Sequence, residues 1–230
     1  MKITENQIEE LYLFTRKHFV EWYDVQTELV DHLANGIEAQ WEQNPNLSFH
    51  EALNNEFKKF GVFGFSEVVE QKTNALSKYY IKEVVKYLKE YFKLPKIILT
   101  FSSIWVLFKI MQIFENKDYV VIPVVLIVFG LVIIYAIKEN TRLNKSYKAT
   151  GKKWLFESIT GQLGGAIHFL NIGIYAPLYS QSNEQWTLTS QLVFSVFVVI
   201  YVLFFYIALK IVSPKLKEKL SKEHPEYNLI

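Results

Sequence analysis

The chain has 230 residues, of which 50% are hydrophobic, and it carries a formal net charge of +2 and no cysteine. The lack of cysteine excludes disulfides, cysteine-ligated zinc and cysteine nucleophiles. The near-neutral net charge is the sum of two regions of opposite charge. Residues 1–71 contain five basic and thirteen acidic side chains, whereas residues 72–93 contain six Lys and two Glu. An acidic N-terminal region also disfavours nucleic-acid binding, which needs a basic face.

Capping signals and apolar spacing predict a small helical domain over residues 1–71. A Ser or Thr followed three residues later by Glu or Gln marks a helix start, and apolar residues at four-residue spacing mark a buried helix face. The predicted helices cover 5–20, 25–43 and 49–60, with capping boxes at Thr4–Gln7 and Ser48–Glu51 and with Asp24 as an N-cap.

Three short motifs between residues 24 and 71 form a recognisable series. They are Glu28-Leu29-x-x-His32-Leu33, Ser48-x-x-Glu51-Ala52-Leu53 and the turn Phe60-Gly61. The series resembles the HAAS and permease-prefix helical domains of bacteria. That resemblance implies a cytoplasmic helical module fused to membrane segments, linked in some members to signalling or to transporters. This chain departs from the pattern in Asn-rich and aromatic insertions, and its second half shows no permease signature. The resemblance therefore implies an interaction module more than transport.

A basic, amphipathic juxtamembrane helix is expected over residues 72–94, continuing a helix that starts near Ser66. Apolar and aromatic residues line one side of it, and lysines at spacings of three and four line another. A solvated lysine face without lipid contact is the alternative. The lysines are Lys78, Lys82, Lys86, Lys89 and Lys93.

Four apolar segments then follow, each near the roughly 20 residues that cross a hydrocarbon core of about 30 Å. They cover 95–114, 119–137, 162–179 and 187–209. Lysines crowd the connectors before the first segment, after the second and after the fourth. The positive-inside rule therefore places both termini in the cytoplasm. We expect an all-α integral membrane protein with a four-helix transmembrane bundle over 95–212 and a cytoplasmic tail over 213–230.

Polar residues inside the expected spans are candidate functional groups, because ionisable side chains are costly in lipid. Lys109, in the first span, either snorkels toward the headgroups or pairs with nearby carboxylates. The third span contains three polar residues, which either form a proton-linked or ligand site or hydrogen-bond across a helix interface. Gly161 and Gly165 have the four-residue spacing of close helix packing and could support an oligomer. The polar residues of this span are Gln162, His168 and Asn171.

A second polar cluster, Glu28, Asp31 and His32, lies on the predicted helix 25–43. Glu28 and His32 share a helix face, and a histidine can bind metal or titrate near neutral pH. A metal site needs three or four converging ligands. We therefore expect no metal here, and expect His32 to make a structural contact with a neighbouring helix.

The functional expectation follows from these features. The chain has no phosphate-binding loop, no nucleophile elbow and no His-Glu-x-x-His pair, so we expect neither catalytic residues nor a cofactor. The sequence favours a non-enzymatic accessory or regulatory protein of the bacterial inner membrane, which contacts lipid and docks another membrane or cytoplasmic protein through its head. The alternative is a small transporter or channel subunit that uses the polar third span.

Overall fold

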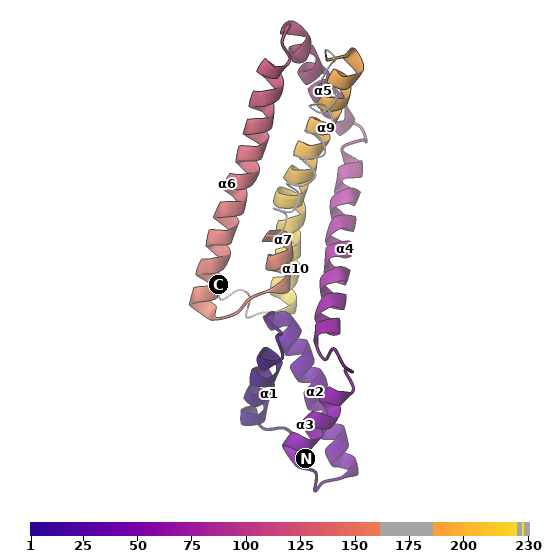
Figure 1. Ribbon diagram of the computed structural model, residues 1–230. Coiled ribbons are helices and arrows are strands. Elements are labelled where there is room, and N and C mark those ends of the chain that lie inside the picture. The colour runs from indigo at the N-terminus through magenta and orange to yellow at the C-terminus, as the bar shows by residue number, and fades with distance from the viewer. Residues whose placement is uncertain (162–185, 225–226, 228–230) are drawn as a thin grey trace. The chain divides into compact units, whose positions relative to one another are not determined.

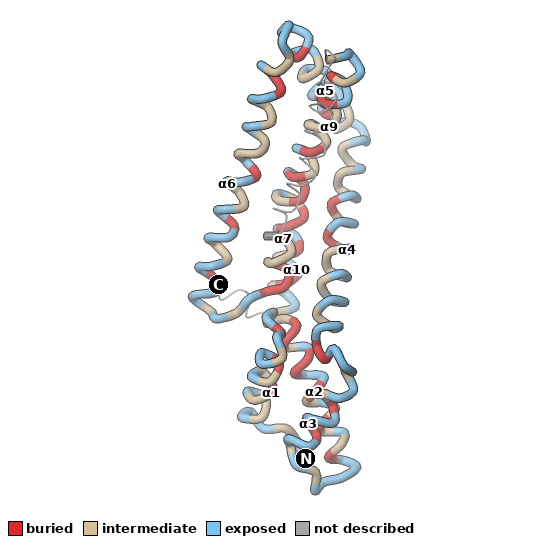
Figure 2. The backbone as a smooth tube through the Cα atoms, in the orientation of Figure 1, coloured by how far each residue is buried: buried red, intermediate tan, exposed pale blue. Residues whose placement is uncertain are grey.

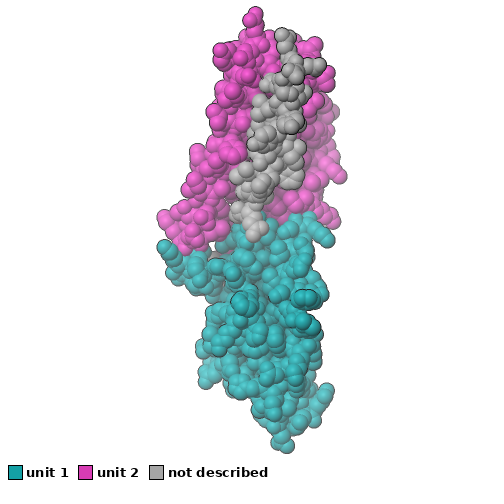
Figure 3. Space-filling model, in the orientation of Figure 1, with its two compact units in different colours: residues 1–78, 146–159 teal, residues 79–145, 160–230 magenta. Residues whose placement is uncertain are grey.

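The computed structural model describes residues 1–161, 186–224 and 227, and these residues are helical with no strand among them (Figure 1). Contacts within the chain divide them into two compact units (Figure 3). Unit 1 contains residues 1–78 and 146–159, and unit 2 contains residues 79–145 and 160–230. The expected all-α class is confirmed for the described residues. Residues 146–159, which the sequence placed in the membrane region, belong to the same unit as the N-terminal helices.

Unit 1 is built on three N-terminal helices around one apolar core. They are α1 (Glu5–Lys17), α2 (Tyr23–Gln43) and α3 (Phe49–Lys58). Apolar positions of α2 recur at four-residue spacing, so they form one buried stripe, visible as red positions in Figure 2. Leu11 of α1 and Leu33 and Ile37 of α2 are fully buried in this core. Residues 66–78 of α4 (Ser66–Glu90) and the first residues of α7 (Leu155–Gly161) complete the unit.

Both expected capping boxes are confirmed, at Thr4–Gln7 and at Ser48–Glu51. The N-cap expected at Asp24 is wrong, because α2 begins at Tyr23 and the Asp24 carboxylate instead accepts a hydrogen bond from Leu155 N–H, at 3.1 Å.

Two helices end earlier than expected. Helix α1 stops at Lys17 rather than at residue 20, because Phe19 takes a positive φ of 64° that breaks the helix. Helix α3 stops at Lys58 rather than at residue 60, and the chain turns at Gly61, whose φ is 73°.

A buried carboxylate joins α2 to α3. Glu56 is 2% exposed and accepts hydrogen bonds from Gln40 Nε2 at 2.6 Å and from Lys59 Nζ at 2.5 Å. Gly36 makes room for it, because a Cβ at that position would lie 2.4 Å from the Glu56 carboxylate. The charge is therefore buried with partners, as a buried carboxylate requires.

Unit 2 contains three described helices that are long and apolar enough to cross a membrane. The first is α5 (Lys96–Ile113) and the second is α6 (Asp118–Thr150). The third is a continuous run of α9 (Leu188–Ile207), the π-helical turn η3 (Ala208–Val212) and α10 (Ser213–Glu223). The predicted span 162–179 lies outside the described residues, so the four-helix bundle stays a prediction.

Helix α6 is much longer than the span expected over 119–137. Its 33 residues measure about 50 Å at 1.5 Å per residue, whereas a hydrocarbon core is about 30 Å thick. Residues 138–150 contain neither Gly nor Pro, so nothing interrupts the helix before Gly151, which has a φ of 67°. The polar segment that follows the apolar run is therefore helix rather than loop.

Side-chain contacts inside unit 2 join its helices. Met111 of α5 and Phe194 of α9 share an apolar cluster, and Val132 of α6 packs with Tyr201 of α9. The hydroxyl of Tyr80, from α4, donates to the carbonyl of Ala208 at 3.0 Å, where the π-helical turn begins. Large apolar side chains remain exposed along α5 and α6, as expected of helices whose solvent is lipid.

Candidate functional site

Residues 146–159 pack against the start of α2 within unit 1. The backbone N–H of Tyr23 donates to the carbonyl of Lys153 at 2.7 Å, in a short parallel bridge between Trp22 and Lys153. Lys153 Nζ forms an ion pair with Glu21 at 2.9 Å. The Leu155 N–H bond to Asp24 continues the contact along the segment. These bonds connect residues more than a hundred positions apart in the sequence.

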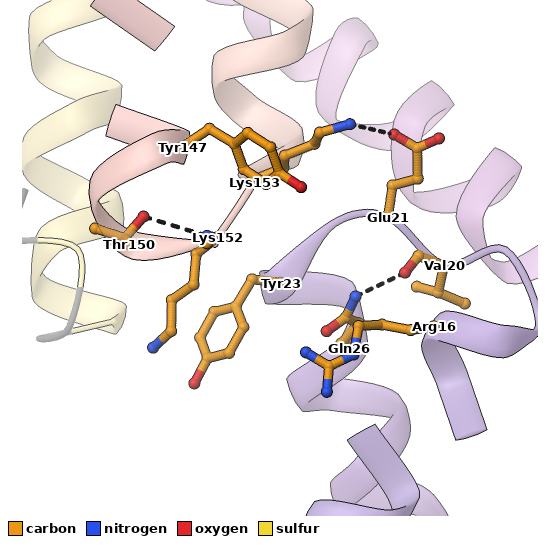
Figure 4. A pocket seen from close by; sticks show the side chains of 10 residues that line it. Arg16, Val20, Glu21, Tyr23, Gln26, Tyr147, Thr150, Lys152 and Lys153 are labelled. Atoms are coloured by element: carbon orange, nitrogen blue, oxygen red, sulfur yellow. Dashed lines mark hydrogen bonds and ion pairs between the residues drawn. The ribbon is translucent and has the colours of Figure 1, made fainter. Parts of the chain in front are cut away.

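A pocket of about 380 Å³ lies at this junction (Figure 4). The α1–α2 connection and the start of α2 form one wall, and the end of α6 with residues 151–153 forms the other. Its charged and aromatic lining residues are Arg16, Glu21, Tyr23, Tyr147, Lys152 and Lys153.

The charge of this pocket is positive overall. Lys152 Nζ lies 3.8 Å from the centre of the Tyr23 ring, within the range of a cation–π contact. Glu21 is already paired with Lys153, and this hydrogen bond raises the pKa of the Lys153 ammonium. Arg16 has no ion-pair partner among the described residues. In the view of Figure 4 the Tyr23 ring lies between the Arg16 and Lys152 side chains. The pocket is therefore suited to an anionic group rather than to a metal cation.

Two turns of unit 1 expose large apolar side chains. Phe19, in the turn after α1, is 88% exposed and holds a positive φ. Val62 and Phe63, in the turn after α3, are 98% and 76% exposed. A positive φ in a residue other than Gly costs about 1–3 kcal/mol, and such strain concentrates at functional sites.

The predicted head cluster is not assembled as one site. Glu28 pairs with Lys72 at 2.6 Å, and Asp31 is exposed. The His32 ring lies 5.5 Å from the Phe60 ring, edge to face. No group of three His, Asp or Glu residues within the described chain could hold a metal ion.

The predicted basic face and the intramembrane lysine are both exposed. Lys109 donates to Gln112 at 3.1 Å, one turn along α5. Four of the juxtamembrane lysines lie on α4 and the fifth follows its end, whereas Tyr80 and Val84 of the same helix are buried. The exposed lysines are Lys78, Lys82, Lys86, Lys89 and Lys93.

The polar residues predicted in the third span lie outside the described residues, as does one of its two packing glycines. These are Gln162, Gly165, His168 and Asn171. The other glycine, Gly161, is the last residue of α7.

The pocket itself was not expected from the sequence. Its signals were present but weak: a Gly-Lys-Lys-Trp stretch at 151–154 and an Arg-Lys pair at 16–17. Each alone indicates only a solvated basic loop.

Comparison of the chain with protein-family models, curated proteins and solved structures yields no match. The resemblance of residues 24–71 to HAAS and permease-prefix domains therefore stays a prediction carried by its short motifs.

Proposed function

We propose that this chain is a non-enzymatic accessory or regulatory protein of the bacterial inner membrane that docks a partner through the acidic surface of its cytoplasmic head. The observation that supports the proposal is the distribution of charge on unit 1. Of the five basic residues in 1–71, only Lys2 lies away from the two turns that expose apolar side chains. The rest of the surface formed by α1, α2 and α3 is therefore almost purely acidic.

The acidic surface includes a stripe along α2. Asp31, Glu38 and Glu42 are spaced by seven and four residues, so they share one helix face. Asp31 and Glu42 are exposed and form no ion pair with any described residue. Uncompensated carboxylates favour a partner with a Lys- or Arg-rich surface and speed its association.

The proposed location rests on the chain's apolar helices and loop charges. The three long apolar helices indicate a multi-pass membrane protein. The lysines beside the apolar segments support cytoplasmic termini by the positive-inside rule. In that orientation the head is presented to cytoplasmic proteins and to the cytoplasmic faces of membrane proteins.

Affinity purification of the full chain from native membranes in mild detergent tests the proposal. We expect a specific protein to co-purify with the wild type and to be lost when the stripe is neutralised by Asp31→Asn with Glu42→Gln. The matched control is Glu67→Gln with Glu70→Gln, which removes two exposed carboxylates from α4 and should retain the partner.

Capture that is equal for the stripe variant and the wild type would overturn the proposed docking surface. If His168→Ala abolished the cellular function while deletion of residues 1–71 were tolerated, the transporter or channel alternative would replace the docking role.

A further inference from the structure

We propose that the end of unit 1 at which α1 and α3 stop binds a protein partner, through an amphipathic segment that carries apolar side chains among carboxylates. We call this end the basic turn surface, and it consists of Arg16, Lys17, Phe19, Lys58, Val62 and Phe63. It shares no residue with the acidic stripe of α2. The inference therefore stands or fails independently of the proposed function.

Three large apolar side chains of the basic turn surface are exposed to solvent. Phe19, Val62 and Phe63 are 88%, 98% and 76% exposed, although unit 1 has an apolar core available for such residues. Single exposed apolar residues are common on protein surfaces, but large ones gathered at one place indicate a contact with another molecule.

The two turns that carry these side chains lie against the same aromatic ring. The His18 ring, one residue before Phe19, lies 4.4 Å from the Phe57 ring. A Cβ added at Gly64, one residue after Phe63, would lie 3.1 Å from that Phe57 ring. The two turns are therefore neighbours within unit 1, and their apolar side chains belong to one surface.

Buried neighbours in the chain hold both turns in place. Val20 is 1% exposed, and its carbonyl accepts a hydrogen bond from Gln26 Nε2 at 2.7 Å. On the other turn, Phe65 is 1% exposed, and the Ser66 N–H donates to the Phe63 carbonyl at 3.2 Å. The exposed side chains are thus presented by a fixed backbone, which reduces the entropy lost when a partner binds.

Phe19 occupies a backbone position that usually holds glycine. Its φ of 64° is the left-handed conformation that ends many helices, and a Cβ makes that conformation unfavourable. The turn after α3 has glycine at its positive-φ positions, Gly61 and Gly64. At Phe19 both the backbone conformation and the exposed ring are unfavourable in the isolated fold. A contact made by the Phe19 ring accounts for a residue that the fold alone does not.

Basic side chains beside the apolar ones determine the charge of the partner. Arg16 and Lys17 precede Phe19, and Lys58 precedes the second turn. None of these three basic residues forms an ion pair with a described residue. The helix dipole accounts for basic residues in the last turn of a helix, but not for exposed apolar residues next to them. A segment that is both acidic and apolar complements the two features together.

A protein segment fits this surface better than an anionic bilayer does. Residues 1–71 contain thirteen acidic side chains, and two of these, Glu67 and Glu70, are exposed four and seven residues after Phe63. Repulsion between exposed charges acts over a Debye length of about 8 Å at physiological salt. A bilayer would extend beyond the basic turn surface and approach such carboxylates, whereas a short segment covers the basic turn surface alone.

Selection of displayed peptides on the full chain tests the inference. The chain is held in nanodiscs of phosphatidylcholine, which has no net charge, and a phage library of random peptides is selected on the wild type and counter-selected on Phe19→Gly. We expect the retained peptides to be enriched in Asp and Glu together with aromatic or aliphatic residues. Their affinity for the wild type should exceed that for Phe19→Gly about tenfold or more, the effect of removing a central apolar anchor.

Matched variants separate binding from folding. Glycine relieves the strain of the positive φ, so Phe19→Gly should melt at the same temperature as the wild type or higher. Phe63→Ser should weaken binding of the same peptides to a similar extent. Arg16→Gln with Lys58→Gln should weaken it about fivefold and reduce its dependence on salt. Lys2→Gln removes a charge outside the basic turn surface and should have no effect.

Any of four results would overturn the inference. The first is a selection that yields no peptide able to distinguish the wild type from Phe19→Gly, and the second is a set of distinguishing peptides without an excess of Asp and Glu. The third is a lower melting temperature for Phe19→Gly, which would assign Phe19 to the stability of unit 1. The fourth is a fluorophore at Phe63→Cys that shifts to the blue only when phosphatidylglycerol is added to the nanodiscs, which would assign the surface to lipid.

Discussion

At the scale of single residues, Gly36 shows how a buried charge is accommodated in a small domain. Gly36→Ala places a methyl group 2.4 Å from the Glu56 carboxylate and forces that side chain away from Gln40 and Lys59. A buried carboxylate that loses its partners costs about 3–5 kcal/mol, and the gain in helix propensity returns only about 1 kcal/mol. We therefore expect a net loss of about 2–4 kcal/mol, seen as a lower melting temperature of the purified full chain.

Gly130→Ala is the matched control, because a Cβ at Gly130 meets no heavy atom within 4 Å. Its melting temperature should equal or exceed that of the wild type. If Gly36→Ala left the melting temperature unchanged as well, the close approach of Gly36 to Glu56 would not contribute to stability.

The Gly36–Glu56 contact could not be predicted from the sequence. In the sequence, Gly36 is a single glycine inside a helical pattern and Glu56 is a glutamate in an amphipathic helix, and both are common. Only the folded structure shows that the missing side chain of Gly36 makes room for the Glu56 carboxylate. Arg16 and Lys152 are similar, since neither is informative until folding brings residues 16 and 152 to one pocket.

At the scale of elements, the capping box of α3 makes helix stability depend on pH. The Ser48 hydroxyl and backbone N–H both donate to the Glu51 carboxylate, which lowers its pKa below the ordinary 4.5. A lowered folded-state pKa stabilises the fold above the unfolded-state pKa. That contribution is lost as the pH falls below about 4.5 and through the folded-state value.

Glu51→Gln isolates this contribution, because Gln also completes a capping box but does not titrate. We expect the melting temperature of the wild type, relative to Glu51→Gln, to decline between pH 6 and pH 3. Parallel pH profiles for the two proteins would show that the Glu51 carboxylate is not linked to folding.

The elements also show where sequence patterns suffice. Both capping boxes were predicted correctly, because the chemistry that starts a helix is contained in four consecutive residues. The predicted end of α1 was wrong, because no sequence pattern near Phe19 indicates its positive φ. Helix α6 extends beyond the predicted span 119–137, because residues 138–150 are polar but contain no Gly or Pro that would end a helix.

At the scale of the whole molecule, unit 1 is assembled from two stretches that lie far apart in the sequence. Residues 146–159 join the N-terminal helices through backbone hydrogen bonds and ion pairs, including Tyr23 to Lys153 and Glu21 to Lys153. Backbone pairing of this kind leaves no periodic pattern in the sequence. The sequence therefore predicted the N-terminal helices and the apolar helices, but not that residues 146–159 join the N-terminal helices in unit 1.

Unit 1 includes residues 146–159, and disulfide cross-linking in native membranes measures this assembly directly. Trp22→Cys with Lys153→Cys joins the two residues that face each other in the parallel bridge, in a chain that has no other cysteine. Glu28→Cys with Lys153→Cys is the control, because Glu28 pairs with Lys72 instead. We expect rapid, nearly complete intramolecular cross-linking of 22 with 153 on mild oxidation, and little of 28 with 153. Equal or absent cross-linking in the two proteins would contradict it.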